Sequence, residues 1–335
     1  KLDSLYWMFN KHPRFEPIIV ICPFLTKGET FLKEELNKSI DFCKLKKYNY
    51  FIAYDEIESK VMDVKSIIKP DLVFFTNPNS KTYKELLIDN FLDTLTCYVP
   101  YSFRIDTLYE YEYNNRLVNL VWLNFYESNI HKNLAIKYAT NKGENVFVSG
   151  YPMLDDYKNK SSSASVWGNK GKHIKKIIWA PHWTISNFQN TGLDWSCFLD
   201  YHKFILDLAN EFKNEIQLAI KPHPFLKSIL AQNSLWGDER TEEYFNYWDE
   251  LDNCQYVEGD YKELFKQSDA LIHDSGSFMT EYLVLNKPIA YTVNEKPIKN
   301  RFNEFGEIVL SGHQLIYSKC DLRNFIEDLK SGVDP

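Results

Sequence analysis

Short apolar runs alternate with amphipathic stretches along most of the chain. Residues 16–24 (EPIIVICPF) form a continuous apolar run between prolines, which is typical of a buried parallel strand. The residues that follow repeat apolar side chains at helical spacing over 31–43, with Lys and Glu between them. In the first half, the pattern predicts strands at 16–24, 48–54, 71–75, 97–101 and 146–151, and a helix at about 116–138. Alternating strands and helices indicate a parallel sheet with helices on both faces.

A second series of strands and helices follows a polar segment. Residues 156–175 (DYKNKSSSASVWGNKGKHIK) are rich in Ser, Lys, Asn and Gly, which predicts an interdomain linker or a mobile loop. After it, the pattern predicts strands at 176–181, 216–220, 254–257, 270–273, 288–293 and 315–317, and helices at 198–212 and 277–285. We therefore expect an α/β chain with one Rossmann-like, doubly wound domain over 1–155 and a second over 176–335. Ligands of such sheets bind outside the carboxyl ends of the strands, so we expect the two domains to face a cleft.

Composition narrows the classes of function. The 335 residues include 39 Lys and Arg against 46 Asp and Glu, and the resulting charge of −7 argues against a nucleic-acid partner. Aromatic residues make up 16%, a share that suits carbohydrate binding and equally suits an aromatic core. The six cysteines form no CxxC pair, which predicts free thiols in a reducing cytosol. No run of 18 apolar residues and no signal peptide is present, and the first residue, Lys, suggests an excised module.

Polar side chains that could bind a ligand or take part in catalysis follow three of the predicted strands in the second half. One strand ends in APHWT and supplies His182, the next ends in KPHP and supplies Lys221 and His223, and the third ends in HDSGS. Because parallel strands end at the same edge of a sheet, these side chains are expected on one rim. We know of no packing reason for polar groups to gather there.

The DSGS segment is the best placed of the three. Its residues Asp274, Ser275, Gly276 and Ser277 precede a predicted helix, whose free N–H groups and dipole suit a phosphate or diphosphate. The structural alternative is ordinary N-capping by Asp274 or Ser275. Glu281 lies four residues after Ser277 on the same helix face and could reach a ribose diol, or it could be a solvated helix residue.

The histidines admit two interpretations. His223 is fixed between prolines, so it could protonate or hydrogen-bond a leaving phosphate, or it could belong to a structural turn. The same two readings apply to His182, beside Trp183. His12 precedes the first strand and could act as the base toward an acceptor, or it could be a surface residue. Arg104, in the first half, is a weak candidate for contact with an anion.

Several well-known motifs are absent from the sequence. It contains no GxGxxG, no GxxxxGK[ST], no GxSxG elbow, no HExxH and no DxD that could hold Mn²⁺. We therefore expect no metal site and no bound cofactor. The charge of a diphosphate would be neutralised by the helix dipole, His and Lys.

The order IIWAPHW, IKPHP and EGDYKELFKQSDALIHDSGSFMTEYLVLNKPIAY resembles the CDP-glycerol glycerophosphotransferase family, the teichoic-acid and capsule polymerases with a GT-B fold. The resemblance spans about 176–293. It implies that His223 contacts the donor diphosphate and assists departure of CMP, that residues 275–277 hold phosphate, and that Glu281 replaces a family acidic residue. His182 and Thr184 stand where the family has Thr and Arg. The family's His-Gly-Thr motif, which carries its presumed base, has no counterpart here.

The sequence thus predicts a transferase of bacterial surface polysaccharide synthesis (capsule, teichoic acid or lipopolysaccharide). It would move glycerol phosphate or ribitol phosphate from a cytidine-type donor to a glycan or lipid-linked acceptor without metal. One alternative is a GT-B glycosyltransferase that uses a CMP-, UDP- or GDP-linked sugar. The other is a non-catalytic nucleotide- or glycan-binding module of a larger polymerase. Such donors and acceptors place the protein in the cytoplasm at the inner membrane face, with peripheral membrane association.

Overall fold

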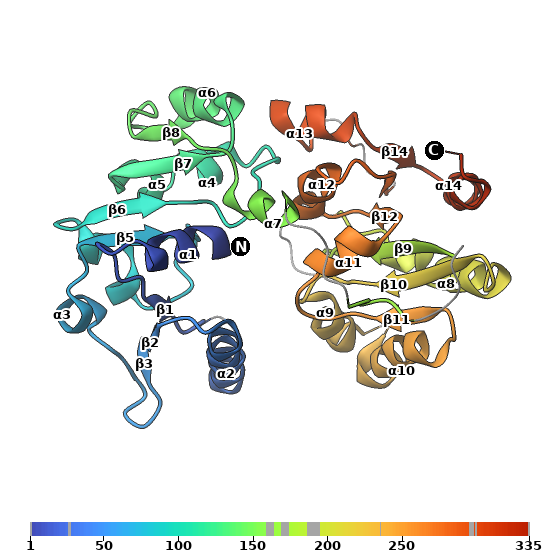
Figure 1. Cartoon of the computed structure of the whole chain (residues 1–335), viewed down its shortest axis with the longest axis horizontal. Coiled ribbons are helices and arrows are strands. Elements are labelled where there is room, and N and C mark those ends of the chain that lie inside the picture. Colours follow the sequence, from blue (N-terminus) through green and yellow to red (C-terminus); the bar gives the residue numbers. More distant parts are fainter. Residues whose placement is uncertain are drawn as a thin grey trace. The chain divides into compact units, whose positions relative to one another are not determined.

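The computed structural model describes residues 2–25, 28–158, 164–168, 174–185, 195–234, 236–294, 298 and 300–333. These residues form two compact units (Figure 1). Unit 1 comprises residues 1–104 and 108–153, and unit 2 comprises residues 105–107 and 154–335. The chain therefore enters unit 2 for three residues, returns to unit 1, and passes into unit 2 again after Met153.

Unit 1 contains short strands and helices. Its helices are α1 (Asp3–Lys11), α2 (Gly28–Lys46), α3 (Val64–Ile68), α4 (Tyr109–Tyr113), α5 (Arg116–Leu120), α6 (Asn129–Tyr138) and the 3₁₀ turns η1 (Lys84–Leu86) and η2 (Ile88–Phe91). Its strands are β1 (Ile19–Ile21), β2 (Tyr50–Ile52), β3 (Tyr54–Asp55), β4 (Lys60–Val61), β5 (Leu72–Phe75), β6 (Leu95–Tyr98), β7 (Leu123–Tyr126) and β8 (Val146–Val148). A further turn, η3 (Pro152–Leu154), spans the boundary between the units.

The strands of unit 1 pair in parallel, apart from the small antiparallel pair β3–β4. The order β5-β6-β7-β8 forms a four-stranded parallel sheet, and β1 pairs with β2 in a separate parallel pair. The prediction of one helix over 116–138 was wrong, because β7 lies inside that range between α5 and α6. Buried Asn124 and Tyr126 alternate with half-buried neighbours in β7, and pairing with β6 and β8 favours the strand.

Unit 2 repeats the strand–helix alternation with longer elements. Its helices are α7 (Asp155–Lys158), α8 (Phe198–Glu211), α9 (Leu226–Gln232), α10 (Gly237–Glu250), α11 (Lys262–Gln267), α12 (Gly276–Leu283), α13 (Glu304–Leu310) and α14 (Lys319–Ser331). Its strands are β9 (Lys175–Ala180), β10 (Ile216–Ile220), β11 (Cys254–Tyr256), β12 (Ala270–His273), β13 (Ile289–Thr292) and β14 (Gln314–Ile316). Each of the six strands predicted in this half corresponds to one of these.

The sheet of unit 2 is parallel throughout, in the order β11-β10-β9-β12-β13-β14. Two apolar clusters show that helices cover both faces (Figure 1). Ile177 and Trp179 of β9 pack with α8, whereas Ile178 and Ala180 pack with α11 and α12, as the alternation of side chains along a strand requires. The strand order reverses between β9 and β12, and ligands of doubly wound sheets bind at this point of reversal.

The segment expected as a linker, 156–175, is described only in part. Its described residues belong to unit 2, where Trp167 is buried beside Ile178 and Asp156 pairs with Lys262. The six cysteines are free, as their spacing predicted. Among the helices that the structure describes, none has both the length and the apolar character needed to cross a membrane.

Candidate functional site

The predicted site residues of unit 2 follow strands that are neighbours in its sheet. His182 follows β9, Lys221 and His223 follow β10, and Asp274 follows β12. These three strands are adjacent and parallel, so their carboxyl ends lie at one edge. The structure therefore brings these residues together at the edge where the strand order reverses.

The rings of His182 and His223 lie close together, with their centroids 5.2 Å apart. The His223 backbone N–H donates to the carbonyl of Pro181, the residue before His182, at 3.0 Å. Nδ1 of His223 accepts the Phe225 N–H at 3.1 Å, which places the proton of a neutral ring on Nε2. His223 is half-buried.

His182 is buried and is held from two sides. Its Nδ1 lies 2.9 Å from the Thr184 hydroxyl, and that hydroxyl oxygen also accepts the Trp195 N–H at 3.0 Å. Burial lowers the pKa of His182 well below its ordinary value, and the nearby His223 ring lowers it further. A neutral His182 follows, which packs beside His223 and fixes the position of that ring.

Lys221 brings a cation to the same edge. Its side chain is 4% exposed, and Nζ lies 5.9 Å from the centroid of the Tyr261 ring. Burial lowers the pKa of Lys221, whereas the charges of Glu258 and Asp260 raise it. A buried ammonium with no ion pair to either carboxylate among the described residues is suited to meet an anion.

Asp274 has a different role from the one its sequence position suggested. Its carboxylate accepts the His182 N–H at 2.5 Å and the Cys197 N–H at 2.6 Å, and the residue is 1% exposed. Burial raises the pKa of Asp274 to about 7, and the two hydrogen bonds oppose that rise. Asp274 therefore joins the loop after β9 and the start of α8 to the end of β12, and it neither caps α12 nor faces a ligand.

The start of α12 carries no side-chain cap. Ser275 occupies the N-cap position without a side-chain hydrogen bond, and its N–H donates to Nδ1 of His273 at 3.1 Å. Ser277 follows in the first turn and is half-buried. A Cβ on Gly276 would lie 2.6 Å from Cζ3 of Trp195, so this position requires glycine for close packing. The helix start keeps the dipole and N–H groups that favour an anion.

Glu281 is fully buried in this structure. Its Oε2 accepts the Tyr261 hydroxyl at 2.5 Å, and its exposed fraction is 0%. Tyr261 in turn lies under Lys221. Glu281 therefore supports the tyrosine beside the lysine, and the expected contact with a ribose is not available to it here.

His12 lies in unit 1, just after α1. It is exposed, and its Nδ1 accepts the Arg14 N–H at 3.3 Å in a local turn.

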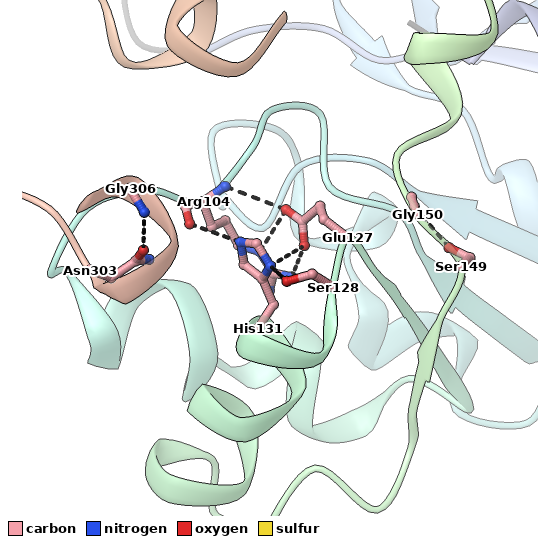
Figure 2. Close-up of polar contacts among 8 residues, drawn as sticks. All are labelled: Arg104, Glu127, Ser128, His131, Ser149, Gly150, Asn303 and Gly306. Carbon is pink, nitrogen blue, oxygen red and sulfur yellow. Dashed lines mark hydrogen bonds and ion pairs between the residues drawn. The ribbon is translucent and has the colours of Figure 1, made fainter. Parts of the chain in front are cut away.

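The suggestion that Arg104 contacts an anion was wrong. Arg104 is 3% exposed and forms an ion pair with buried Glu127 at 2.5 Å (Figure 2). Its guanidinium carbon lies 3.6 Å from the centroid of the Tyr126 ring. Nε2–H of His131 donates to the Arg104 carbonyl oxygen at 3.0 Å, and Nδ1 accepts the Ser128 hydroxyl at 2.7 Å. Since a carbonyl can only accept, Nε2 carries the proton, and this group fixes the chain where it leaves unit 1.

Two further residues lie at the edge of the unit 2 sheet and were missed in the sequence. Tyr291 of β13 donates its hydroxyl to the Asp274 carbonyl at 3.4 Å, and Nη1 of Arg301 donates to that hydroxyl oxygen at 3.5 Å. Arg301 belongs to no motif, and its contact with Tyr291 of β13, the strand that pairs with β12, brings it here. The described residues include no group of three or more His, Cys, Asp and Glu placed to hold a metal ion.

Solved structures share this architecture over nearly the whole chain. The UDP-GlcNAc 2-epimerase of Neisseria meningitidis, bound to UDP-GlcNAc, has a TM-score of 0.62 and 13% identity over 99% of this chain and 88% of its own. S. aureus MnaA in complex with UDP has a TM-score of 0.60 and 16% identity, over 98% and 84%. The wall teichoic acid polymerase TagF has a TM-score of 0.57 and 15% identity, over 99% and 84%. The likeness establishes the GT-B fold.

No curated protein matches the sequence at a significant level. A family model does match, over residues 114–298, which is more than half of the chain. The family is described as CDP-glycerol:poly(glycerophosphate) glycerophosphotransferase, and the matched span contains β9, β10 and β12 with the side chains that follow them. The chain is therefore a transferase that belongs to the CDP-glycerol:poly(glycerophosphate) glycerophosphotransferase family.

Proposed function

We propose that this enzyme transfers glycerol phosphate or ribitol phosphate from a CDP-linked donor to a hydroxyl group of a surface polysaccharide, such as teichoic acid or capsule. Unit 2 would bind the donor, with its phosphates at the start of α12. The observation that carries the proposal is the convergence of His223, Lys221 and the uncapped α12 start at the point where strand order reverses. The description of the family supports a CDP-linked donor.

The α12 start provides the anion site in this proposal. Ser275 and Ser277 contribute hydroxyl groups, and the first N–H groups of the eight-residue helix point toward its N-terminus. Gly276 lets Trp195 pack against the helix start and closes one side of it. A diphosphate bound there accepts hydrogen bonds from main chain and side chains together.

His223 and Lys221 would act on the leaving group. The acceptor oxygen forms a bond to the β-phosphorus and gives up its hydroxyl proton to solvent water. The bond from that phosphorus to the bridging oxygen breaks, and CMP departs with that oxygen. Nε2–H of His223 would hydrogen-bond the bridging oxygen as its negative charge develops, and Lys221 would offset the charge of the α-phosphate. His182 positions the His223 ring, and no metal ion is needed in this scheme. We assign no proton transfer to His12.

A panel of donors tests the proposal. We expect CDP-glycerol or CDP-ribitol to release CMP in the presence of a glycan acceptor, with one phosphorus gained by the product per turnover. Release from a CMP-, UDP- or GDP-linked sugar, with no phosphorus gained, would instead establish a glycosyltransferase. Absence of nucleotide release with every donor would contradict the proposal.

Matched variants test the site. His223→Ala removes the N–H donor to the bridging oxygen and should lower kcat by about 10²–10³, the usual cost of losing one such hydrogen bond, and Ser277→Ala should raise the KM for the donor. Ser331→Ala, at an exposed site on α14, serves as the control and should behave as the wild type. Normal turnover by both site variants would show that the donor binds elsewhere.

A further inference from the structure

We propose that Arg301 binds the donor phosphate beside the start of α12, where Tyr291 and Asn294 hold its guanidinium in place. The inference rests on the proposed function and adds a contact that neither the sequence motifs nor the family description assigns. It concerns only residues of unit 2.

A chain of contacts places Arg301 at this edge of the sheet. Nη2 of Arg301 donates to Oδ1 of Asn294 at 3.0 Å, and Nη1 donates to the Tyr291 hydroxyl oxygen at 3.5 Å. The Tyr291 hydroxyl donates onward to the carbonyl of Asp274, the residue directly before the N-cap Ser275. Since Tyr291 belongs to β13 and Asp274 follows the adjacent parallel strand β12, these contacts place the guanidinium near the carboxyl ends of both strands.

The partners of Arg301 distinguish it from other arginines of the chain. Arg104 pairs with Glu127, Arg116 pairs with Asp89, and Arg323 pairs with Glu211. Within the described residues, Arg301 forms no ion pair, and both of its hydrogen-bond acceptors are neutral. The arrangement orients the guanidinium and leaves its charge to be balanced by another group.

The chemistry of a guanidinium suits this place. It has five N–H donors in a planar fork that matches two phosphate oxygens, and only two of its hydrogen bonds are made within the described residues. Arg301 thus offers the proposed anion site a positive charge with a planar set of donors, which the single ammonium group of Lys221 does not have.

A structural explanation competes with this one. The charge of Arg301 lowers the pKa of Asp274, so the guanidinium could serve only to balance a buried carboxylate. The carboxylate, however, already accepts two backbone N–H groups, and it forms no ion pair with Arg301 among the described residues. The two explanations differ in what they predict for phosphate binding.

Calorimetric titration with CDP, CMP and cytidine separates them. Arg301→Gln should weaken the binding of CDP by at least about tenfold, since hydrogen bonds to charged groups contribute about 1.5–3 kcal/mol, and should leave the affinity for cytidine unchanged. Arg301→Lys should recover part of the loss, because it keeps the charge without the fork. Arg323→Gln, which removes a half-exposed arginine on α14, is the matched control.

Each result bears on a different claim. If the wild type fails to bind CDP, the proposed function itself is contradicted. If the wild type and Arg301→Gln bind CDP equally well, only the proposed role of Arg301 is contradicted. The same conclusion follows if Arg301→Gln weakens the binding of cytidine as much as the binding of CDP. If Arg301→Gln does not fold, the test uses Arg301→Lys instead. An unchanged affinity of Arg301→Lys for CDP together with a lower melting temperature would establish the structural explanation.

Discussion

The carboxylate of Asp274 accepts a hydrogen bond of 2.5 Å from the backbone N–H of His182, a residue that lies 92 positions earlier in the chain. Its other oxygen accepts the Cys197 N–H at 2.6 Å. One buried side chain thus joins the loop after β9 and the start of α8 to the end of β12. The positions of His182 and His223 depend on this arrangement, since the two rings are in contact.

Replacement of Asp274 by Asn should therefore destabilise the protein. Asn keeps one acceptor oxygen but turns an NH₂ group toward the second backbone N–H, which leaves two buried donors facing each other. We expect a loss of about 1–3 kcal/mol in the free energy of unfolding, measured by urea titration at about pH 8. Weaker donor binding should accompany it, because His182 loses its anchor. Unchanged stability would mean that the carboxylate contributes nothing to the folded state.

Gly276 is expected to tolerate no larger side chain. In Gly276→Ala the new methyl group would lie 2.6 Å from Cζ3 of Trp195, so the ring or the helix start must shift. Overpacking of this kind typically costs about 1–3 kcal/mol. A double-mutant cycle with Trp195→Leu gives the control: the smaller side chain should remove most of the cost of the alanine. Equal costs in both backgrounds would contradict the packing explanation.

The Arg104–Glu127 pair is expected to stabilise unit 1 and to have no part in donor binding. Glu127→Gln leaves a buried guanidinium without its counter-charge, which should cost about 3–5 kcal/mol in the free energy of unfolding. The double variant Arg104→Met/Glu127→Leu removes both charges and should recover most of that loss. The affinity of the folded double variant for CDP should equal that of the wild type. A specific loss of CDP binding would restore Arg104 as an anion contact.

Stability below neutral pH should depend on His313. Burial lowers the pKa of this residue from 6.5 to about 4, so the folded state favours the neutral ring. Above pH 6.5 the ring is neutral in both the folded and the unfolded state, and the free energy of unfolding is not reduced by His313. As the pH falls from 6.5 toward 4, the unfolded state binds the proton first, and the free energy of unfolding decreases by up to about 3 kcal/mol. His313→Gln cannot titrate, so its stability relative to the wild type should rise over that range. Denaturant unfolding of both proteins at several pH values measures this, and a constant difference would contradict it.

The strands of unit 2 could be predicted because each is a short apolar run followed by polar residues. β10, β12 and the last four residues of β9 are buried, so most of their positions are apolar and each stands out as a short apolar run. β7 could not be predicted in this way. Asn124 is one of its two buried residues, and its amide donates to the Val118 carbonyl, a contact that no local pattern reveals. The neighbouring strands β6 and β8 decide that this segment is extended.

The sequence by itself determined which side chains meet at the edge of the unit 2 sheet. Parallel strands that end in His182, His223 and the DSGS segment must end together, because hydrogen bonding between the strands aligns them. Tertiary structure decided what each side chain does there. It turned Asp274 inward to two backbone N–H groups, buried Glu281 under Tyr261, and brought Arg301 to the start of α12. These roles depend on contacts between residues far apart in the chain, and such contacts cannot be predicted from the spacing of residues along the sequence.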